Sequence, residues 1–182
     1  MNRKVKRLGM GCMRFPFDRK ETENMIIKAV AEGINYFDTA YIYPNSEKTL
    51  GDILHKHKLR EKVFIATKLP HRKCKKFEDF DLFFNEQKSR LKTDYIDYYL
   101  IHNINALSNW TDLERINIKK WIEQKKESGE IINIGFSFHG LQAEFLKVID
   151  VYNWDFCQIQ YNYMNENYQA GTKGLKAAAT KG

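Results

Sequence analysis

Four side chains suited to acid–base chemistry stand at or just beyond the ends of three strand-like segments. Asp38 ends the strand part of GINYFDTAYIY, Lys68 ends VFIATK, and His102 follows YIDYYLI. Tyr43 stands five residues after Asp38, in the segment that leaves the first of these strands. Because the carboxyl ends of parallel strands lie at one edge of a sheet or one mouth of a barrel, we expect these four side chains to converge.

Together the four residue types suit the reduction of a carbonyl group, which needs a hydride on carbon and a proton on oxygen. Tyr43 is the candidate proton donor. A phenol has a pKa of about 10, and we expect the ammonium of Lys68 to lower the pKa of Tyr43. Asp38 would hold that ammonium in place, and His102 would orient the carbonyl oxygen. Taken singly, each residue has an ordinary explanation as a cap, a surface ion pair or a packed side chain, but their joint placement favours a site.

Strands and helices alternate along the chain with a period of roughly 30 residues, which is typical of βαβ units in a parallel sheet. No G-x-G-x-x-G run follows the first strand, so a dinucleotide-binding Rossmann fold lacks its main signature. The pattern favours a (β/α)8 barrel of which about six units are present. We expect strands near 8–15, 35–38, 63–68, 95–101, 131–136 and 156–161, helices at 21–32, 46–54, 77–91, 116–128, 141–151 and 174–181, and a loop through Trp110.

Length and composition favour a single domain over residues 1–182, incomplete at its C-terminal end. A hydrophobic fraction of 43% over 182 residues suffices for a substantial core. The sequence has no apolar run of about 18 residues and no signal-peptide core, so we expect no membrane span. Cys12, Cys74 and Cys157 are far apart, which argues against disulfides and against a metal or iron–sulfur site. A cytoplasmic location follows as the expectation.

The net charge of +7 does not by itself indicate nucleic-acid binding, because basic residues are scattered among acidic ones. The one dense run, HRKCKK at 71–76, follows a predicted strand, and we interpret it as a solvated loop. The weaker alternative is that it steers a phosphorylated cofactor or an acidic partner. No aromatic-and-basic RNA motif accompanies the run, so we expect no nucleic-acid partner.

The sequence resembles the aldo-keto reductase family over essentially its whole length. The matching segments, in family order, are LGMGCMRF, GINYFDTAYIY with NSEKTLG, VFIATKLP, LKTDYIDYYLIHN, IINIGFSFHG and FCQIQYNYMNENYQAGTKGL. The resemblance implies NADP-dependent reduction of small aldehydes or ketones, with Asp38, Tyr43, Lys68 and His102 as the catalytic tetrad and Tyr43 as the general acid. The family pattern D-T-A-x-x-Y selects Tyr43 rather than Tyr41, which we assign to packing or to the pocket wall.

By the same resemblance, Ser137 and Gln158 match the positions that hold the nicotinamide carboxamide at the ends of the fifth and sixth strands. The family usually has asparagine after that serine, whereas this chain has Phe138 followed by His139. Pro44 also replaces the usual glycine after the tyrosine, without changing the tetrad spacing. For the aromatic residues Tyr161, Tyr163 and Trp110 we expect packing rather than a role in a substrate pocket.

The version of the motifs in this chain is similar to a bacterial subgroup whose longer members often carry a ferredoxin-like iron–sulfur segment. This chain lacks the cysteines for such a segment, so a cluster would belong only to a longer parent protein. Family members continue into two further strands that bind the cofactor phosphates. The alternative reading is therefore a non-catalytic truncated barrel that acts as a binding subunit or an inactive fragment. An open six-stranded sheet would also expose two edges through which copies could associate.

Overall fold

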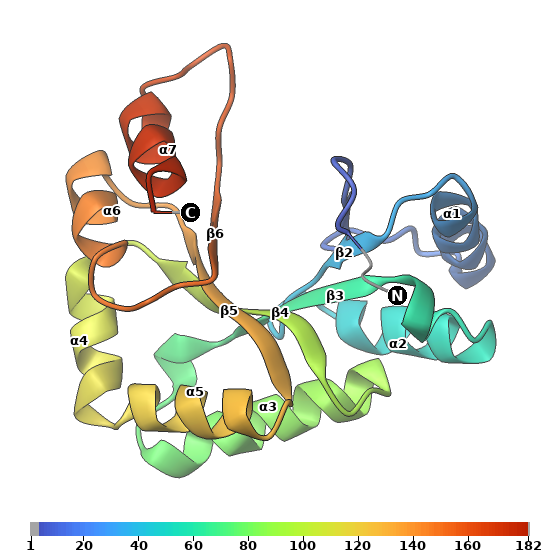
Figure 1. The fold of residues 1–182 in the computed structure, drawn as a ribbon. Coiled ribbons are helices and arrows are strands. Elements are labelled where there is room, and N and C mark those ends of the chain that lie inside the picture. Colours follow the sequence, from blue (N-terminus) through green and yellow to red (C-terminus); the bar gives the residue numbers. More distant parts are fainter. Residues whose placement is uncertain (1–3, 182) are drawn as a thin grey trace.

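A computed structural model describes residues 4–181 of the chain. Within these residues six strands form one parallel sheet, and their order in the sheet is their order in the chain (Figure 1). Each strand pairs only with its neighbours in sequence, as successive units of a (β/α)8 barrel do. The strands are β1 (Met10–Gly11), β2 (Tyr36–Asp38), β3 (Phe64–Leu69), β4 (Ile96–Ile104), β5 (Ile131–Phe138) and β6 (Phe156–Ile159).

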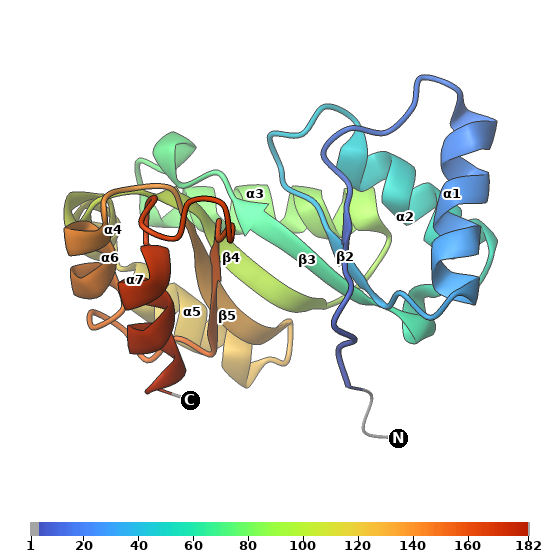
Figure 2. The same cartoon turned by 90° about the horizontal axis from the view of Figure 1, so that it is seen from above.

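Helices connect consecutive strands and lie along the outside of the curled sheet, as the view from above shows (Figure 2). None of the helices in the described part of the chain is both long and apolar enough to cross a membrane. The helices are α1 (Arg19–Ala31), α2 (Ser46–Lys56), α3 (Phe77–Leu91), α4 (Leu107–Arg115), α5 (Ile118–Glu127), α6 (Gln142–Val148) and α7 (Gly171–Ala179), with short 3-10 turns at Arg60–Lys62 and His71–Lys73.

The first helix shows how local sequence sets the element boundaries. The Asp18 side chain accepts a hydrogen bond of 2.8 Å from the Lys20 backbone amide, which caps the start of α1. At the other end Gly33 has a φ of +88°, a left-handed conformation that glycine adopts without strain. The chain therefore leaves α1 abruptly and enters β2 three residues later, where the site begins.

Alternation along the strands separates a core face from a site face. Phe37, Ile65 and Tyr99 are fully buried between the sheet and the helices. Asp38 and Lys68 project from the opposite, inner face, where their side chains meet. Trp121 of α5, also fully buried, packs against the core side of the sheet with its ring centroid 6.0 Å from that of Tyr99. This packing fixes the strands, and the strands fix which side chains reach the inner face.

Several element boundaries differ from those predicted from the sequence; for example, β1 is only Met10–Gly11 and β6 ends at Ile159. Two of the differences bear on the site or its surroundings. The expected loop through Trp110 contains helix α4, because Trp110 and Leu113 are buried three residues apart on one helical face. The Asn109 side chain caps this helix by accepting from the amides of Asn105 and Ala106. The second difference is that β4 continues to Ile104, so His102 lies within the strand rather than after it. The many polar residues between His102 and Arg115 made both the end of β4 and the helix α4 hard to predict from the sequence.

Substitution of Gly135 by alanine is expected to lower the free energy of unfolding by about 2 kcal/mol or more through overpacking. Gly135 pairs with Phe156 across β5 and β6, and a Cβ there would lie 2.4 Å from the Phe156 carbonyl oxygen. Urea denaturation measures the effect. At Gly11 an added Cβ would meet no atom within 4 Å, so Gly11→Ala serves as the control and should change stability by less than about 0.5 kcal/mol. Equal losses in both variants would contradict the prediction.

Candidate active site

The centre of the site is the ammonium group of Lys68. Only 2% of this side chain is exposed, and it donates to both carboxylate oxygens of Asp38 and, at 2.7 Å, to the Thr39 carbonyl oxygen. An ammonium group has three donors, so these acceptors occupy all of them. Burial lowers the pKa of Lys68, and the neighbouring charge of Asp38 opposes that shift. Residues at the carboxyl ends of β2 and β3 thus form one buried ion pair.

Tyr43 covers this ion pair from the segment that follows β2. The Lys68 nitrogen lies 5.2 Å from the centroid of the Tyr43 ring. The same ring meets the His102 imidazole edge-on, with centroids 5.8 Å apart. Two turn hydrogen bonds hold the backbone, from the Tyr43 amide to the Ala40 carbonyl and from the Ser46 amide to the Tyr43 carbonyl. The structure therefore brings Asp38, Tyr43, Lys68 and His102 together, as the sequence predicts.

The expected direction of the Tyr43 pKa was wrong. Burial and the nearby carboxylate of Asp38 raise the pKa of Tyr43 above its usual value, whereas the sequence argument expected Lys68 to lower it. Burial of the phenol is the larger cause, and the carboxylate of Asp38, which also offsets part of the charge of Lys68, is the second. Tyr43 therefore carries its proton at neutral pH, in the form that a proton donor requires.

His102 lies opposite Tyr43 on the inner face of β4. Burial, together with the positive charges of Lys68 and Arg72 and the histidines His71 and His139, lowers the pKa of His102 to about 4. The imidazole is consequently neutral at physiological pH. A neutral imidazole has one N–H group and can donate a single hydrogen bond without adding charge to the site.

The lowered pKa of His102 predicts a pH dependence of stability. Between about pH 6.5, the usual histidine pKa in an unfolded chain, and about pH 4, the unfolded state binds more protons at this residue than the folded state. The contribution of this residue is therefore complete above that window and falls as the pH drops through it, by about 3 kcal/mol. Urea unfolding of the protein and of His102→Gln across this range tests the prediction, because the variant should lose less stability on acidification. Parallel pH profiles would contradict it.

Ser137 and Gln158 lie side by side at the next two strand ends. They are register partners on β5 and β6. The Ser137 hydroxyl accepts a hydrogen bond of 2.8 Å from the Asn103 amide, which leaves its proton available to another acceptor. Gln158 is exposed and its amide nitrogen donates to Asp38 at 3.3 Å. All six predicted site residues thus gather on the inner face near the carboxyl ends of β2 to β6.

Phe138 and His139, the two residues after Ser137 that depart from the usual family pattern, lie in different surroundings. Phe138 is fully buried on the core face of β5, because strand alternation turns it away from Ser137. His139 follows, and its Nδ1 lies 3.2 Å from the Gln169 side-chain oxygen. The residue that replaces the family's asparagine therefore contributes to the core.

A buried polar network that sequence reasoning missed lies behind Lys68, between the sheet and the helices. The Glu47 carboxylate of α2, 1% exposed, accepts hydrogen bonds from Thr67 at 2.6 Å and from Gln87 at 2.7 Å. Gln87 also donates to the Lys68 carbonyl oxygen, and its own oxygen accepts from the Tyr99 hydroxyl. The sequence held one indication of this network, because Gln87 is a polar residue on the apolar face of the predicted helix 77–91. Nothing in the sequence marked Glu47 as its partner.

The structure also locates the other aromatic residues and the basic run that the sequence analysis singled out. Tyr41 donates its hydroxyl to Glu86 at 2.8 Å and stacks under the Arg90 guanidinium, away from the ion pair. Trp110 is fully buried, whereas Tyr163 is largely exposed. The run 71–76 is not simply a solvated loop: it begins with a 3-10 turn, and His71 and Cys74 are buried.

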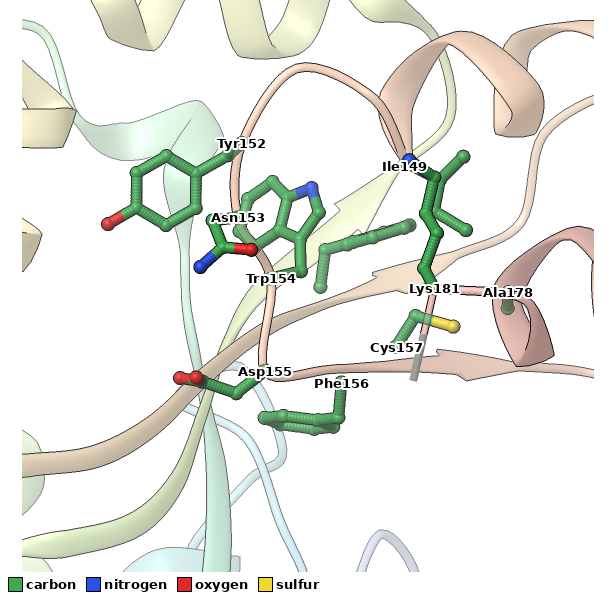
Figure 3. A pocket seen from close by; sticks show the side chains of 10 residues that line it. Ile149, Tyr152, Asn153, Trp154, Asp155, Phe156, Cys157, Ala178 and Lys181 are labelled. Atoms are coloured by element: carbon green, nitrogen blue, oxygen red, sulfur yellow. The ribbon is translucent and has the colours of Figure 1, made fainter.

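A further cavity lies away from this site, and the described residues form no metal site. This cavity has a volume of about 210 Å³ and is lined by Trp154, Phe156 and Cys157 among others, at the amino-terminal end of β6 and hence at the opposite end of the sheet. Figure 3 shows the side chains that line it. Within residues 4–181 no group of three or more histidine, cysteine and acidic side chains is arranged to hold a metal ion.

Comparison with known proteins identifies the family. The aldo/keto reductase family model matches residues 7–180. An aldo-keto reductase from Mycobacterium sp. (strain KMS) is 29% identical over 148 residues, which cover 80% of this chain and 49% of that protein. The chain thus spans about half the length of the curated relatives that it matches first.

Solved structures agree with this fold. The holo form of an aldo-keto reductase from Bacillus halodurans aligns with a TM-score of 0.69 and 26% identity, over 86% of this chain and 54% of that one. A candidate aldo-keto reductase from Pseudomonas aeruginosa aligns with a TM-score of 0.80 and 25% identity, over 97% and 70%. The six βα units are therefore part of a (β/α)8 barrel, and the chain belongs to the aldo/keto reductase family.

Proposed function

We propose that the protein is an NADP-dependent oxidoreductase that reduces a small aldehyde or ketone to an alcohol, with Tyr43 as the general acid. The observation that carries the proposal is the buried ammonium of Lys68, which is held by Asp38 directly beneath the Tyr43 ring and faces His102. Membership of a family of reductases supports it.

Each residue has a role that follows from its state. Tyr43 holds the proton at Oη, because burial raises its pKa, and donates it to the carbonyl oxygen. The positive charge of Lys68 stabilises the phenolate that remains, and Asp38 keeps that charge in position. Neutral His102 orients the carbonyl oxygen through its single N–H group. The developing negative charge therefore meets one proton donor, one hydrogen-bond donor and one cation.

The residues at the ends of β5 and β6 fit a nicotinamide. A carboxamide needs both a donor and an acceptor, and the Ser137 hydroxyl and the Gln158 side chain supply these on adjacent strands. The chemistry that a bound NADPH supplies is a hydride for the carbonyl carbon, which leaves NADP⁺ and an alkoxide that needs one proton. We propose Ser137 and Gln158 as the cofactor-binding residues of this chain.

Two further parts of the proposal concern the setting of the protein. The sheet has β1 and β6 as its edges within the described residues, and unpaired strand edges favour self-association. The cysteines Cys12, Cys74 and Cys157 are free thiols, which supports a reducing compartment such as the cytoplasm. Sizing chromatography with light scattering measures the association.

A fluorescence titration of the chain with NADPH, run beside NADH, tests the function. Saturable binding that favours NADPH, followed by aldehyde-dependent consumption of NADPH, is the expected result. A folded sample that binds neither nucleotide would contradict the proposal and favour a binding subunit instead. Circular dichroism on the same sample establishes that it is folded.

A further inference from the structure

We propose that the cavity beside His102 is a subsite for an anionic group of the substrate, so that the favoured substrates are short carbonyl compounds that carry a carboxylate or a phosphate. The proposal rests on the function proposed above and adds the substrate class. The cavity has a volume of about 250 Å³ and lies between the 3-10 turn at 71–73 and the end of β4. His102 forms one wall, and Arg72 and Lys73 form another.

The charged side chains that line this cavity are all positive. Arg72 and Lys73 are exposed, and neither makes an ion pair within residues 4–181. No aspartate or glutamate lines the cavity. Lys73 also lies over the Tyr41 ring, with its nitrogen 5.1 Å from the centroid. Two unpaired cations beside a cavity attract an anion and raise its local concentration.

The field of these cations reaches the catalytic side of the cavity. Arg72 is among the charges that lower the pKa of His102, so its guanidinium acts on the imidazole that faces the carbonyl group. Tyr43 does not line the cavity, so an anionic substrate group held by Arg72 would lie in the cavity and not against the Tyr43 ring. The carbonyl end would point toward His102 and Tyr43, whose rings are in contact. A volume of about 250 Å³ fits a compound that spans these two ends.

The cavity wall also carries buried polar atoms without a protein partner. They are Nε2 of His71, a residue that is 6% exposed, and the side-chain oxygen of Asn103. Buried polar atoms in proteins nearly always have a hydrogen-bond partner, which here has to come from water or a ligand. Asn103 has a φ of +54°, and its backbone amide donates a hydrogen bond to the Ser137 hydroxyl. This hydrogen bond holds the backbone at this wall of the cavity in place. The cavity thus offers hydrogen bonds as well as charge.

The test compares two matched pairs of compounds with the 182-residue chain. 4-Carboxybenzaldehyde is compared with benzaldehyde, and glyceraldehyde 3-phosphate with glyceraldehyde, by calorimetric binding and by NADPH consumption. We expect the anionic member of at least one pair to bind at least about tenfold more tightly, and added salt to reduce the difference. The preferred pair distinguishes a carboxylate subsite from a phosphate subsite. Equal affinity within both pairs would overturn the proposal.

The double variant Arg72→Gln, Lys73→Gln should remove this preference and leave the affinity for the neutral compounds unchanged. Its control is Lys75→Gln, Lys76→Gln, which removes the same charge from the same run but from residues that do not line the cavity. Similar losses in the two double variants would overturn the subsite, since general charge would then explain the binding. An anion preference without any reduction would contradict the proposed function alone. Reduction of both members of each pair at equal kcat/KM would contradict the subsite alone.

Discussion

Replacing Tyr43 with phenylalanine is expected to lower kcat for aldehyde reduction by about 1,000-fold while the affinity for NADPH stays unchanged. General acid catalysis contributes about 100- to 10,000-fold, and the substitution removes only the hydroxyl that donates the proton. The phenylalanine ring can keep the contacts with Lys68 and His102, because both involve the ring itself. The decrease in NADPH absorbance gives the rate, and NADPH fluorescence gives the affinity.

Tyr41→Phe is the matched control for this experiment. It also removes one tyrosine hydroxyl from the same segment, but that hydroxyl donates to Glu86 rather than facing Lys68. We expect a change in kcat of less than about threefold. If Tyr43→Phe kept full turnover, or if Tyr41→Phe lost as much, the assignment of Tyr43 as the general acid would be wrong.

The second large effect concerns stability rather than catalysis. Glu47→Ala is expected to lower the free energy of unfolding by about 3 kcal/mol. The carboxylate is buried and accepts from Thr67 and Gln87, and Arg90 pairs with it at 3.1 Å. Removing one member of a buried network leaves the others without partners, which costs more than the net contribution of the hydrogen bonds themselves. Urea denaturation followed by tryptophan fluorescence measures the loss.

Glu86→Ala provides the comparison for Glu47→Ala. Glu86 also binds Arg90, but 42% of its side chain is exposed. Exposed ion pairs contribute about 0 to 1 kcal/mol, so a loss of less than about 1 kcal/mol is expected. A Glu47→Ala variant as stable as Glu86→Ala would show that water enters the space behind Lys68 and replaces the carboxylate.

The placement of the candidate site residues could be predicted because it depends on strand alternation and strand ends. The carboxyl ends of neighbouring parallel strands lie at one end of the sheet, and strand alternation decides which face each side chain occupies. Once the strands are recognised, Asp38, Lys68 and His102 are therefore expected to lie close together. The error in the end of β4 did not matter, because His102 still projects from the inner face. Local pattern and topology together were sufficient for this part of the fold.

The remaining features depend on contacts between residues far apart in the sequence. Helix α4 was missed because its polar residues hide the two buried side chains, Trp110 and Leu113. The Glu47–Gln87 contact joins two helices, and a single sequence gives no register between them. The predicted direction of the Tyr43 pKa was wrong for a similar reason: the pKa depends on how deeply the phenol is buried and on its distance from the Asp38 carboxylate.

The order of the strands also determines how the site can form during synthesis. Each strand pairs with the one made just before it, so a growing chain can add strands to one edge without waiting for distant partners. Asp38, Tyr43, Lys68 and His102 all belong to the segment that ends with β4 at Ile104. The four proposed catalytic residues are therefore expected to leave the ribosome before β5 and β6, which carry the proposed nicotinamide contacts.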